Sequence, residues 1–389
     1  MRILVVGAGM YVTGRGGHGP GVLLAAIFEA ARDMEISQVT VAAIREDNEG
    51  TVIEAVSRLR EQLKTGVNVD YIALGDKGMT GMGAGVLASF DAGIVCVPDH
   101  LHFEISKQLL AAHMHVLVVK PLTPTLDEAG ELVQLAAAGN LYGAVEFHKR
   151  YDQSNQYAQK ALAENMIGDP LYAVVHYSQK KLIPIDMFRS WATRTNIAQY
   201  LGVHYIDLIW HLTHFRPQRV VAVGVKSFLT KEGIDTWDSV HATVEWEKPH
   251  GDTFVSQFNL NWIEANKSSA MSDQLLLIVG SEGRLDLDQR NRGVTLTTEQ
   301  NGVSDVNPYF AEFLPGADGE QRFTGYGFES VRQFLQDVAD LEVGRVTLDH
   351  LNGHRPSFQD ALPSCAVIDA LNRSLLSSGE WQEIKHAHV

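Results

Sequence analysis

The run Met-Arg-Ile-Leu-Val-Val-Gly-Ala-Gly, residues 1–9, joins an apolar segment directly to two glycines. Only four large apolar residues precede the first glycine, which indicates a buried strand and is too few for a secretory signal. A Gly-x-Gly after such a strand is typical of a dinucleotide-binding turn, because the missing side chains permit a tight turn and close approach of a pyrophosphate. We therefore expect Gly7, Gly9 and the adjoining Met10 to contact a dinucleotide.

The third glycine of that pattern is out of register, since Val12 stands where it is expected. The candidates to replace it are three later glycines, Gly14, Gly16 and Gly17. Pro20 suits the first turn of the following helix. That helix would then begin about eight residues later than in the usual motif.

The second apolar run, residues 38–44, ends at Arg45. In an NAD-binding unit this place usually carries an acidic residue that binds the ribose hydroxyls, whereas an arginine favours a 2′-phosphate. The sequence therefore predicts NAD or NADP as cofactor and favours NADP. The alternative is that Arg45 is a solvated loop residue and that Glu46 or Asp47 binds the ribose.

The first 150 residues alternate short apolar runs with longer amphipathic ones, which indicates βα units and a parallel sheet. The expected strands are 2–6, 38–44, 70–74, 92–97, 115–119 and 142–148. Thr125 and Glu128 form a capping box that begins a helix over 125–138. Lys120 thus lies in a strand-to-helix loop, where a lysine either reaches the surface or faces a ligand, because an isolated ammonium is costly to bury.

After Tyr151 the pattern changes to longer alternating runs, which indicate a largely antiparallel sheet. The expected strands are 171–178, 219–226, 239–246, 253–263, 275–279, 284–288 and 293–299. Helices are expected over 201–214, near 328–342 and over 361–377, the last with Gly379 as its C-cap. The sequence therefore predicts a nucleotide-binding α/β domain over residues 1–150 and a sheet domain over residues 151–389.

Composition limits the partners. The formal net charge of -15 argues against nucleic acid or an anionic membrane as a main partner, since both attract excess lysine and arginine. Cys96 and Cys365 are the only cysteines, too few for a disulfide framework or a four-thiolate metal site, and they fit a reducing cytoplasm. No stretch approaches the roughly 18 apolar residues that span a bilayer, so we expect a soluble, cytoplasmic protein.

Three further motifs follow the Gly-x-Gly start: Val-Pro-Asp-His-Leu-His at 97–102, the pair Lys120-Pro121, and Gly-Val-His-Tyr-Ile-Asp at 202–207. In order and spacing the chain resembles the glucose-fructose oxidoreductase, inositol dehydrogenase and rhizopine catabolism (Gfo/Idh/MocA) family over essentially its whole length. The resemblance implies an α/β fold class: an N-terminal Rossmann domain with a doubly wound parallel sheet, then a C-terminal α/β domain with a large, mainly antiparallel open-faced sheet.

The resemblance also implies roles for individual residues. Lys120 matches the lysine of the family's Glu-Lys-Pro motif, which touches both the nicotinamide ribose and a substrate oxygen. Val119 replaces the glutamate, which removes the usual neighbouring carboxylate. Pro98 and His102 match the family's cofactor-lining loop, although His102 could equally be the first residue of a helix with no ligand.

His204 matches the family's catalytic histidine, because it precedes Asp207 by three residues at the start of a helix. Where the family often has a second aspartate, four residues before the histidine, this chain has Tyr200, which can only hydrogen-bond or donate a proton. Lys120, His204 and Tyr200 are therefore the predicted catalytic residues. The alternative is a core histidine bonded to Asp207. His204, Asp207 and His211 have a helical spacing that could suit a metal site, but the resemblance implies no metal there.

Arg150 matches a basic residue often found where the chain leaves the first domain, and it meets either the cofactor or only a carboxylate across the domain boundary. Trp191 and Arg194 precede the predicted helix of His204. Together with Asp207 they are the predicted substrate contacts.

The function that the resemblance implies is hydride transfer between NAD(P) and a secondary alcohol or ketone of a sugar, sugar derivative or cyclitol. His204 would take or return the hydroxyl proton, and Lys120 would stabilise the developing alkoxide. The alternatives are a non-catalytic NAD(P)-binding regulator and an imine or enone reductase with Tyr200 as proton donor. A homodimer or homotetramer is expected, because an open-faced sheet must cover its outer surface.

Overall fold

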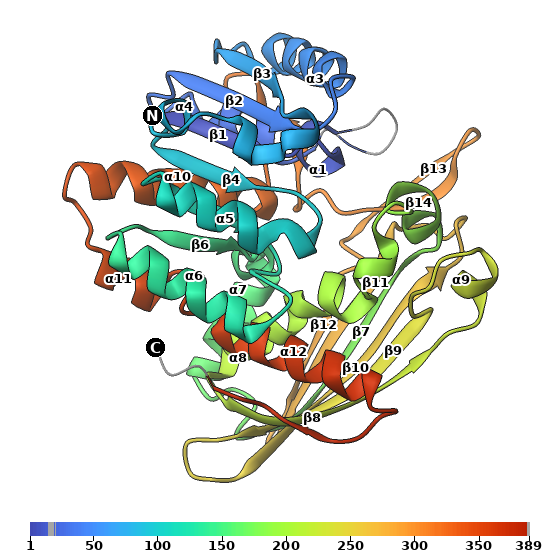
Figure 1. Cartoon of the computed structure of the whole chain (residues 1–389). Helices are drawn as coiled ribbons and strands as arrows, with labels where there is room; N and C mark the ends of the chain where they lie inside the picture. Colours follow the sequence, from blue (N-terminus) through green and yellow to red (C-terminus); the bar gives the residue numbers. More distant parts are fainter. Residues whose placement is uncertain (15–18, 20, 387–389) are drawn as a thin grey trace.

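The computed structural model describes residues 1–14, 19 and 21–386, and two large sheets dominate it (Figure 1). The first sheet has six parallel strands in the order β3-β2-β1-β4-β5-β6. They are β1 (Arg2–Val6), β2 (Gln38–Ala43), β3 (Val69–Ala73), β4 (Ala92–Val95), β5 (His115–Val119) and β6 (Gly143–Glu146). The strand order reverses between β1 and β4, which confirms the predicted doubly wound parallel sheet.

Helices cover both faces of this sheet, because its strands are apolar on both sides. Ile3 and Val5 pack with one set of helices, whereas Leu4 and Val6 pack with the other. The first set is α2 (Leu23–Ala30), α3 (Asn48–Leu63) and α10 (Tyr326–Glu342), and the second is α4 (Ala84–Leu87), α5 (His102–Ala111) and α6 (Leu126–Ala138). Thr125 caps α6 by accepting a hydrogen bond from the backbone N–H of Glu128, as predicted.

The turn after β1 requires a glycine at position 7 and leads into a short helix. A Cβ at Gly7, whose φ is +114°, would lie 2.0 Å from the carbonyl oxygen of Cys96, so no other residue fits there. The four-residue helix α1 (Met10–Thr13) begins directly after Gly9, and α2 follows at Leu23. The predicted late helix is therefore present as α2, whereas the short helix α1 before it was not predicted. The structure describes Gly14, whereas Gly16, Gly17 and Pro20 lie outside the described residues.

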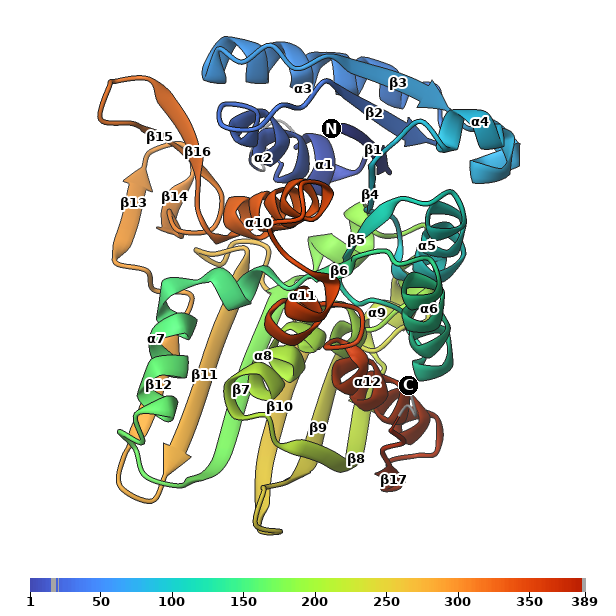
Figure 2. The same ribbon diagram turned by 90° about the vertical axis from the view of Figure 1, so that its left-hand side faces the viewer.

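The second sheet has seven strands in the order β12-β11-β7-β10-β9-β8-β17. Its bounds are β7 (Pro170–Lys180), β8 (Arg216–Val225), β9 (Ser239–Glu247), β10 (Thr253–Glu264), β11 (Ser272–Gly280), β12 (Arg284–Asp288) and β17 (Gln382–Glu383). Only β7 and β10 pair in parallel, so the sheet is mainly antiparallel as predicted. Helices cover one of its faces (Figure 2), namely α7 (Gln153–Ala163), α8 (Val203–Thr213) and α12 (Leu362–Leu376).

Segments late in the chain return to the first sheet. Helix α10 packs against α2, and Leu351 of α11 (Leu348–His354) joins the same apolar cluster. Between β12 and α10 the chain forms two ribbons, of which sequence patterns indicated only one strand (Figure 2). They are β13 (Val294–Thr298) with β14 (Gly302–Val306) and β15 (Glu312–Pro315) with β16 (Gln321–Thr324).

The last long helix of the chain ends earlier than predicted. Helix α12 ends at Leu376 with Ser377 as its C-cap, so the C-cap predicted at Gly379 is wrong, although Gly379 has a φ of +84° and its N–H binds the carbonyl of Ser374. The remaining helix is the short α9 (Phe228–Lys231). Within the described ranges, the structure has no helix whose length and apolar character would let it cross a membrane.

Candidate active site

Lys120 lies at the carboxyl end of β5 and is buried. Its Nζ donates a hydrogen bond to the backbone carbonyl of Tyr200 and lies 3.9 Å from the centre of the Tyr200 ring. Burial lowers the pKa of Lys120 to about 8, and the carboxylates of Asp99 and Glu146 oppose that shift. Lys120 is therefore held inside the protein and not released to the surface.

Tyr200 lies in the π-helical turn Ala198–Gly202, directly before α8, and belongs to a group of aromatic side chains. Its ring centre lies 4.8 Å from that of Phe188, 5.8 Å from that of Trp191 and 5.9 Å from that of Trp262. Burial raises the pKa of the Tyr200 phenol. At neutral pH the tyrosine is therefore a neutral hydrogen-bond partner, where an aspartate would bring a charge.

His204 lies in the first turn of α8 and is buried. Its Nδ1 has no hydrogen-bond partner among the described residues. Burial lowers its pKa well below the ordinary value, and positive charge on His148, Lys120 and Lys149 adds to the effect. His204 is thus a neutral imidazole close to Lys120.

Asp207, one turn further along α8, does not bind His204. Both of its carboxylate oxygens accept hydrogen bonds from Arg150, whose guanidinium also pairs with Asp360. Burial raises the pKa of Asp207 to about 6, although Arg150 opposes the rise. The interpretation of His204 as a core histidine bonded to Asp207 is therefore wrong. The same geometry argues against the cofactor contact expected of Arg150 and the substrate contact expected of Asp207.

His102 joins two loops at the carboxyl ends of neighbouring strands. Its Nδ1 lies 2.7 Å from the carbonyl oxygen of Pro121, and its Nε2 lies 3.0 Å from that of Val97. The imidazole is buried, which lowers its pKa. His102 therefore fixes the loop after β4, including the half-buried Pro98, to the loop that carries Lys120.

The two remaining predicted substrate residues lie in the segment between β7 and α8. Trp191 is half-buried and stacks near Phe188, with ring centres 4.5 Å apart, so it belongs to the aromatic group around Tyr200. Arg194 is exposed, and its charge adds to the effect of burial in lowering the pKa of His100. The structure thus brings Trp191, Tyr200 and Lys120 together, whereas Arg194 lies nearer the loop after β4.

Sequence reasoning missed a second polar cluster at the end of β6. The carboxylate of Glu146 accepts hydrogen bonds from Tyr11 (3.0 Å), from Ser330 (2.6 Å) and from Nδ1 of His148 (3.1 Å). The ring centres of His148 and His204 lie 4.5 Å apart. A signal existed in the sequence, since Glu146 and His148 are polar residues at the carboxyl end of an apolar strand, as Lys120 is.

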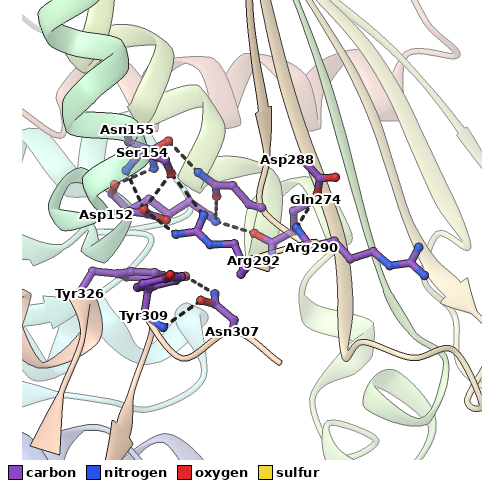
Figure 3. Close-up of polar contacts among 12 residues, drawn as sticks. Asp152, Ser154, Asn155, Gln274, Asp288, Arg290, Arg292, Asn307, Tyr309 and Tyr326 are labelled. Atoms are coloured by element: carbon purple, nitrogen blue, oxygen red, sulfur yellow. Dashed lines mark hydrogen bonds and ion pairs between the residues drawn. The ribbon is translucent and has the colours of Figure 1, made fainter. Parts of the chain in front are cut away.

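The next residue, Lys149, is also buried, and it anchors the second domain. Its Nζ donates hydrogen bonds to the side-chain carbonyls of Gln274 (2.5 Å) and Gln289 (2.7 Å). Burial lowers its pKa to about 7. Figure 3 shows the surrounding contacts, in which Arg292 pairs with Asp152 at the start of α7. These bonds tie the segment after β12 to the end of the first domain.

The glycine turn lies at the point where the strand order of the first sheet reverses, which is where open α/β sheets bind ligands. Among the described residues, a Cβ at Gly9 would meet no atom within 4 Å, so these residues leave open space at the start of α1, beside the half-buried Met10. Gly7, Gly9 and Met10 therefore fit the pyrophosphate side of a dinucleotide. Arg45 lies exposed beyond β2 and pairs with Asp47, which leaves the choice between NAD and NADP open.

Comparisons with known proteins agree on one family. A model described as an oxidoreductase family with an NAD-binding Rossmann fold matches residues 1–147. A model described as the GFO/IDH/MocA C-terminal domain matches residues 155–286.

Curated relatives are similar over part of the chain. Glucose-6-phosphate 3-dehydrogenase of Bacillus subtilis is 28% identical over 147 residues, which cover 36% of this chain and 42% of that protein. The NADP(+)-dependent scyllo-inositol 2-dehydrogenase IolW of the same organism is 27% identical over 156 residues, 40% of this chain and 42% of that protein. The chain thus spans about two fifths of the length of the curated relatives that it matches.

Solved structures resemble the chain over its whole length. An inositol dehydrogenase homolog from Azotobacter vinelandii, complexed with NADH and myo-inositol, is 19% identical with a TM-score of 0.70, covering 98% of this chain and 97% of that one. Scyllo-inositol dehydrogenase from Lactobacillus casei, with NAD(H) and scyllo-inositol, is 17% identical with a TM-score of 0.66, covering 99% of both chains. At these identities the likeness shows the fold.

Proposed function

The chain belongs to the GFO/IDH/MocA oxidoreductase family, and from that premise we propose that it transfers a hydride between NAD(P) and a secondary alcohol or ketone of a sugar, sugar derivative or cyclitol. The observation that carries the proposal is the meeting of Lys120, Tyr200 and His204 at the carboxyl end of β5, in the sheet whose glycine turn fits a dinucleotide. Similarity to a sugar-phosphate dehydrogenase and an inositol dehydrogenase supports the substrate class.

The chain's own residues would handle the proton and the developing charge. The bound nicotinamide supplies the hydride acceptor or donor. In the oxidation, neutral His204 takes the hydroxyl proton, and the ammonium of Lys120 stabilises the alkoxide as the proton leaves. Tyr200 orients Lys120 through its carbonyl and its ring. The aromatic side chains of Phe188 and Trp191 offer apolar surface for the C–H face of a ring.

NADP as the preferred cofactor rests on Arg45 alone. An exposed arginine just after β2 would meet a 2′-phosphate once it releases Asp47. Thermal-shift titration with NAD and NADP tests this directly, because a bound ligand raises the melting temperature with its concentration. If Arg45→Ala weakens NADP and leaves NAD unchanged, the preference is supported; equal loss for both cofactors contradicts it.

The enzymatic proposal is tested by turnover on a panel of sugars, inositols and their phosphates. Lys120→Ala and His204→Ala should each reduce turnover by at least about 10²-fold, while cofactor binding survives in the histidine variant. His350→Ala, on the exposed helix α11, is the matched control and should keep full activity. Tight cofactor binding without turnover on the whole panel would favour a regulator. Turnover of imines in place of sugars would favour the reductase.

A homo-oligomer is proposed from the uncovered face of the second sheet. Large apolar side chains are exposed there on four strands: Tyr172, Val223, Ile263 and Leu275. An apolar sheet face of this kind is stable in water when a second copy covers it. Light scattering after size-exclusion chromatography should give a dimer or tetramer, and Val223→Glu with Ile263→Glu should dissociate it. A monomeric native protein would refute the proposal.

A further inference from the structure

Two imidazoles lie side by side in the candidate site, and they have unequal surroundings. The rings of His148 and His204 are 4.5 Å apart at an interplanar angle of 49°. Nδ1 of His148 lies 3.1 Å from a carboxylate oxygen of Glu146, whereas Nδ1 of His204 is buried without a partner among the described residues. Two imidazolium ions at this separation would repel each other strongly, so the pair accommodates one proton far more readily than two.

The groups that face the pair come from five parts of the chain. Around His148 these are Glu146, the hydroxyl of Tyr11 on α1, and the rings of Phe310 and Tyr326. Around His204 the charged groups are His148 itself, Lys120 after β5 and Lys149. The only carboxylate bonded to either imidazole, among the described residues, is thus Glu146, and it lies on the His148 side.

We propose that Glu146 makes His148 the member of this pair that binds a proton first, and so keeps His204 as the free base. His148 is then a positioning residue that acts through His204. The inference rests on the function proposed above, and it adds two residues that the family motif does not supply. Glu146 is the register partner of Val119 on the neighbouring strand, so a carboxylate missing from β5 is present on β6.

The role in the reaction follows from the proton's path. In the oxidation the C–H hydride leaves for the nicotinamide, the O–H bond breaks, and an N–H bond forms on His204. A proton on His204 lies beside the charges of Lys120 and Lys149 with no carboxylate bonded to the ring, so it leaves His204 for solvent, whereas a proton on His148 is balanced by the Glu146 carboxylate. His204 is then a base again for the next turnover, and the ketone product carries no extra proton.

The first test needs neither cofactor nor substrate. Histidine side chains of the apoprotein are followed by NMR over a pH titration, with His148 and His204 assigned by the loss of one signal in His148→Phe and in His204→Gln. The expected result is that His148 protonates before His204 as the pH falls. Protonation of His204 before His148 would overturn the proposal. The titration is measured on the native protein, and the two variants serve only to assign the signals.

The second test removes the charge and keeps the packing. His148→Phe preserves an aromatic ring against His204, but it removes the repulsion, so the midpoint of His204 protonation should rise by about one pH unit. The acid limb of the alcohol-oxidation profile should move upward with it. Glu146→Gln keeps the hydrogen bonds of Tyr11 and Ser330 but removes the carboxylate charge, so the midpoints of His148 and His204 protonation should move closer together. Phe310 also packs on His148 but carries no charge, so Phe310→Leu should move neither the His204 midpoint nor the acid limb of the profile.

The outcomes separate the two proposals. An unchanged His204 midpoint in His148→Phe, with native circular dichroism, would reduce His148 to a packing residue and overturn the inference. Failure of the native enzyme to turn over any alcohol would instead refute the proposed function, while the apoprotein titration would still report on the imidazole pair.

Discussion

Replacing Lys120 with methionine should make the protein more stable and nearly inactive. A pKa of about 8 means that the folded protein holds this ammonium roughly 3 kcal/mol less favourably than the unfolded chain does, where the pKa is 10.5. Methionine removes that cost and fills a similar volume. It also removes the contacts with the carbonyl and ring of Tyr200, together worth about 1–2 kcal/mol. The net expected gain is about 1–2 kcal/mol.

The stability difference between Lys120→Met and the native protein should also depend on pH, in a direction that follows from the lowered pKa of Lys120. Below about pH 8 the lysine is charged in both states and the full cost is present. Between about pH 8 and 10.5 the folded protein loses the proton first, so the native protein gains stability relative to Lys120→Met. The variant's advantage should therefore shrink as the pH rises through this window.

The assay is thermal unfolding at about pH 7 and about pH 10, beside a turnover assay. At the lower pH the variant should melt about 1–3 °C above the native protein, because a change of about 1–2 kcal/mol is spread over the large unfolding entropy of a long chain, and turnover should fall at least about 10²-fold. Lys107→Met is the matched control, because Lys107 forms an exposed pair with Glu131 and its loss should leave both quantities unchanged. A less stable Lys120→Met at the lower pH, or an advantage that is equal at both values, would refute the reasoning.

Three further predictions concern the parts that hold the site. Asp207→Asn should destabilise the protein by about 3 kcal/mol in urea unfolding, because the buried Arg150 keeps only the half-buried Asp360 as a charge partner. An unchanged unfolding midpoint would contradict the importance of the Arg150–Asp207 pair. Gly7→Ala should reduce the free energy of unfolding by at least about 2 kcal/mol, because the added Cβ would overlap the carbonyl of Cys96. Gly9→Ala should keep the stability and weaken dinucleotide binding in a thermal-shift titration. Equal losses of stability in the two variants would contradict this geometry. Tyr200→Phe keeps the ring and the carbonyl that contact Lys120, so turnover should fall less than about tenfold, and a loss as large as that of His204→Ala would identify the Tyr200 hydroxyl as the proton donor.

The first domain could be predicted closely because local signals there agree with one another. Apolar runs, the turn glycines and the capping residue Thr125 all act within a few residues of themselves. Six strands of the second sheet were predicted for the same reason, whereas β17 was not, and the strand expected over 293–299 pairs with β14 outside this sheet. The ribbon β15–β16 was not predicted, because its short strands carry no strong alternation. The helix start after Gly9 was also missed, since α1 is four residues long.

The candidate site divides in the same way. Lys120 and His204 were found from motifs, because each follows a recognisable local pattern. The partner of Asp207 could not be read from the sequence, since Arg150 lies 57 residues away and the helical spacing equally suggested His204. Glu146 and His148 were passed over although they follow an apolar strand, because that position alone does not distinguish a polar residue that faces a partner inside the protein from one that faces water.

The sequence by itself determined the Gly-x-Gly strand of residues 1–9, the parallel sheet that follows it, and the type of chemistry that Lys120 and His204 can perform. Only the tertiary structure decided which charges meet. Arg150 is held by Asp207 and Asp360, Lys120 by the backbone and ring of Tyr200, and His148 by Glu146. The physical reason is that hydrogen bonds and desolvation act over a few ångströms in space, whatever the separation along the chain, whereas strand and turn patterns are set by neighbours in sequence.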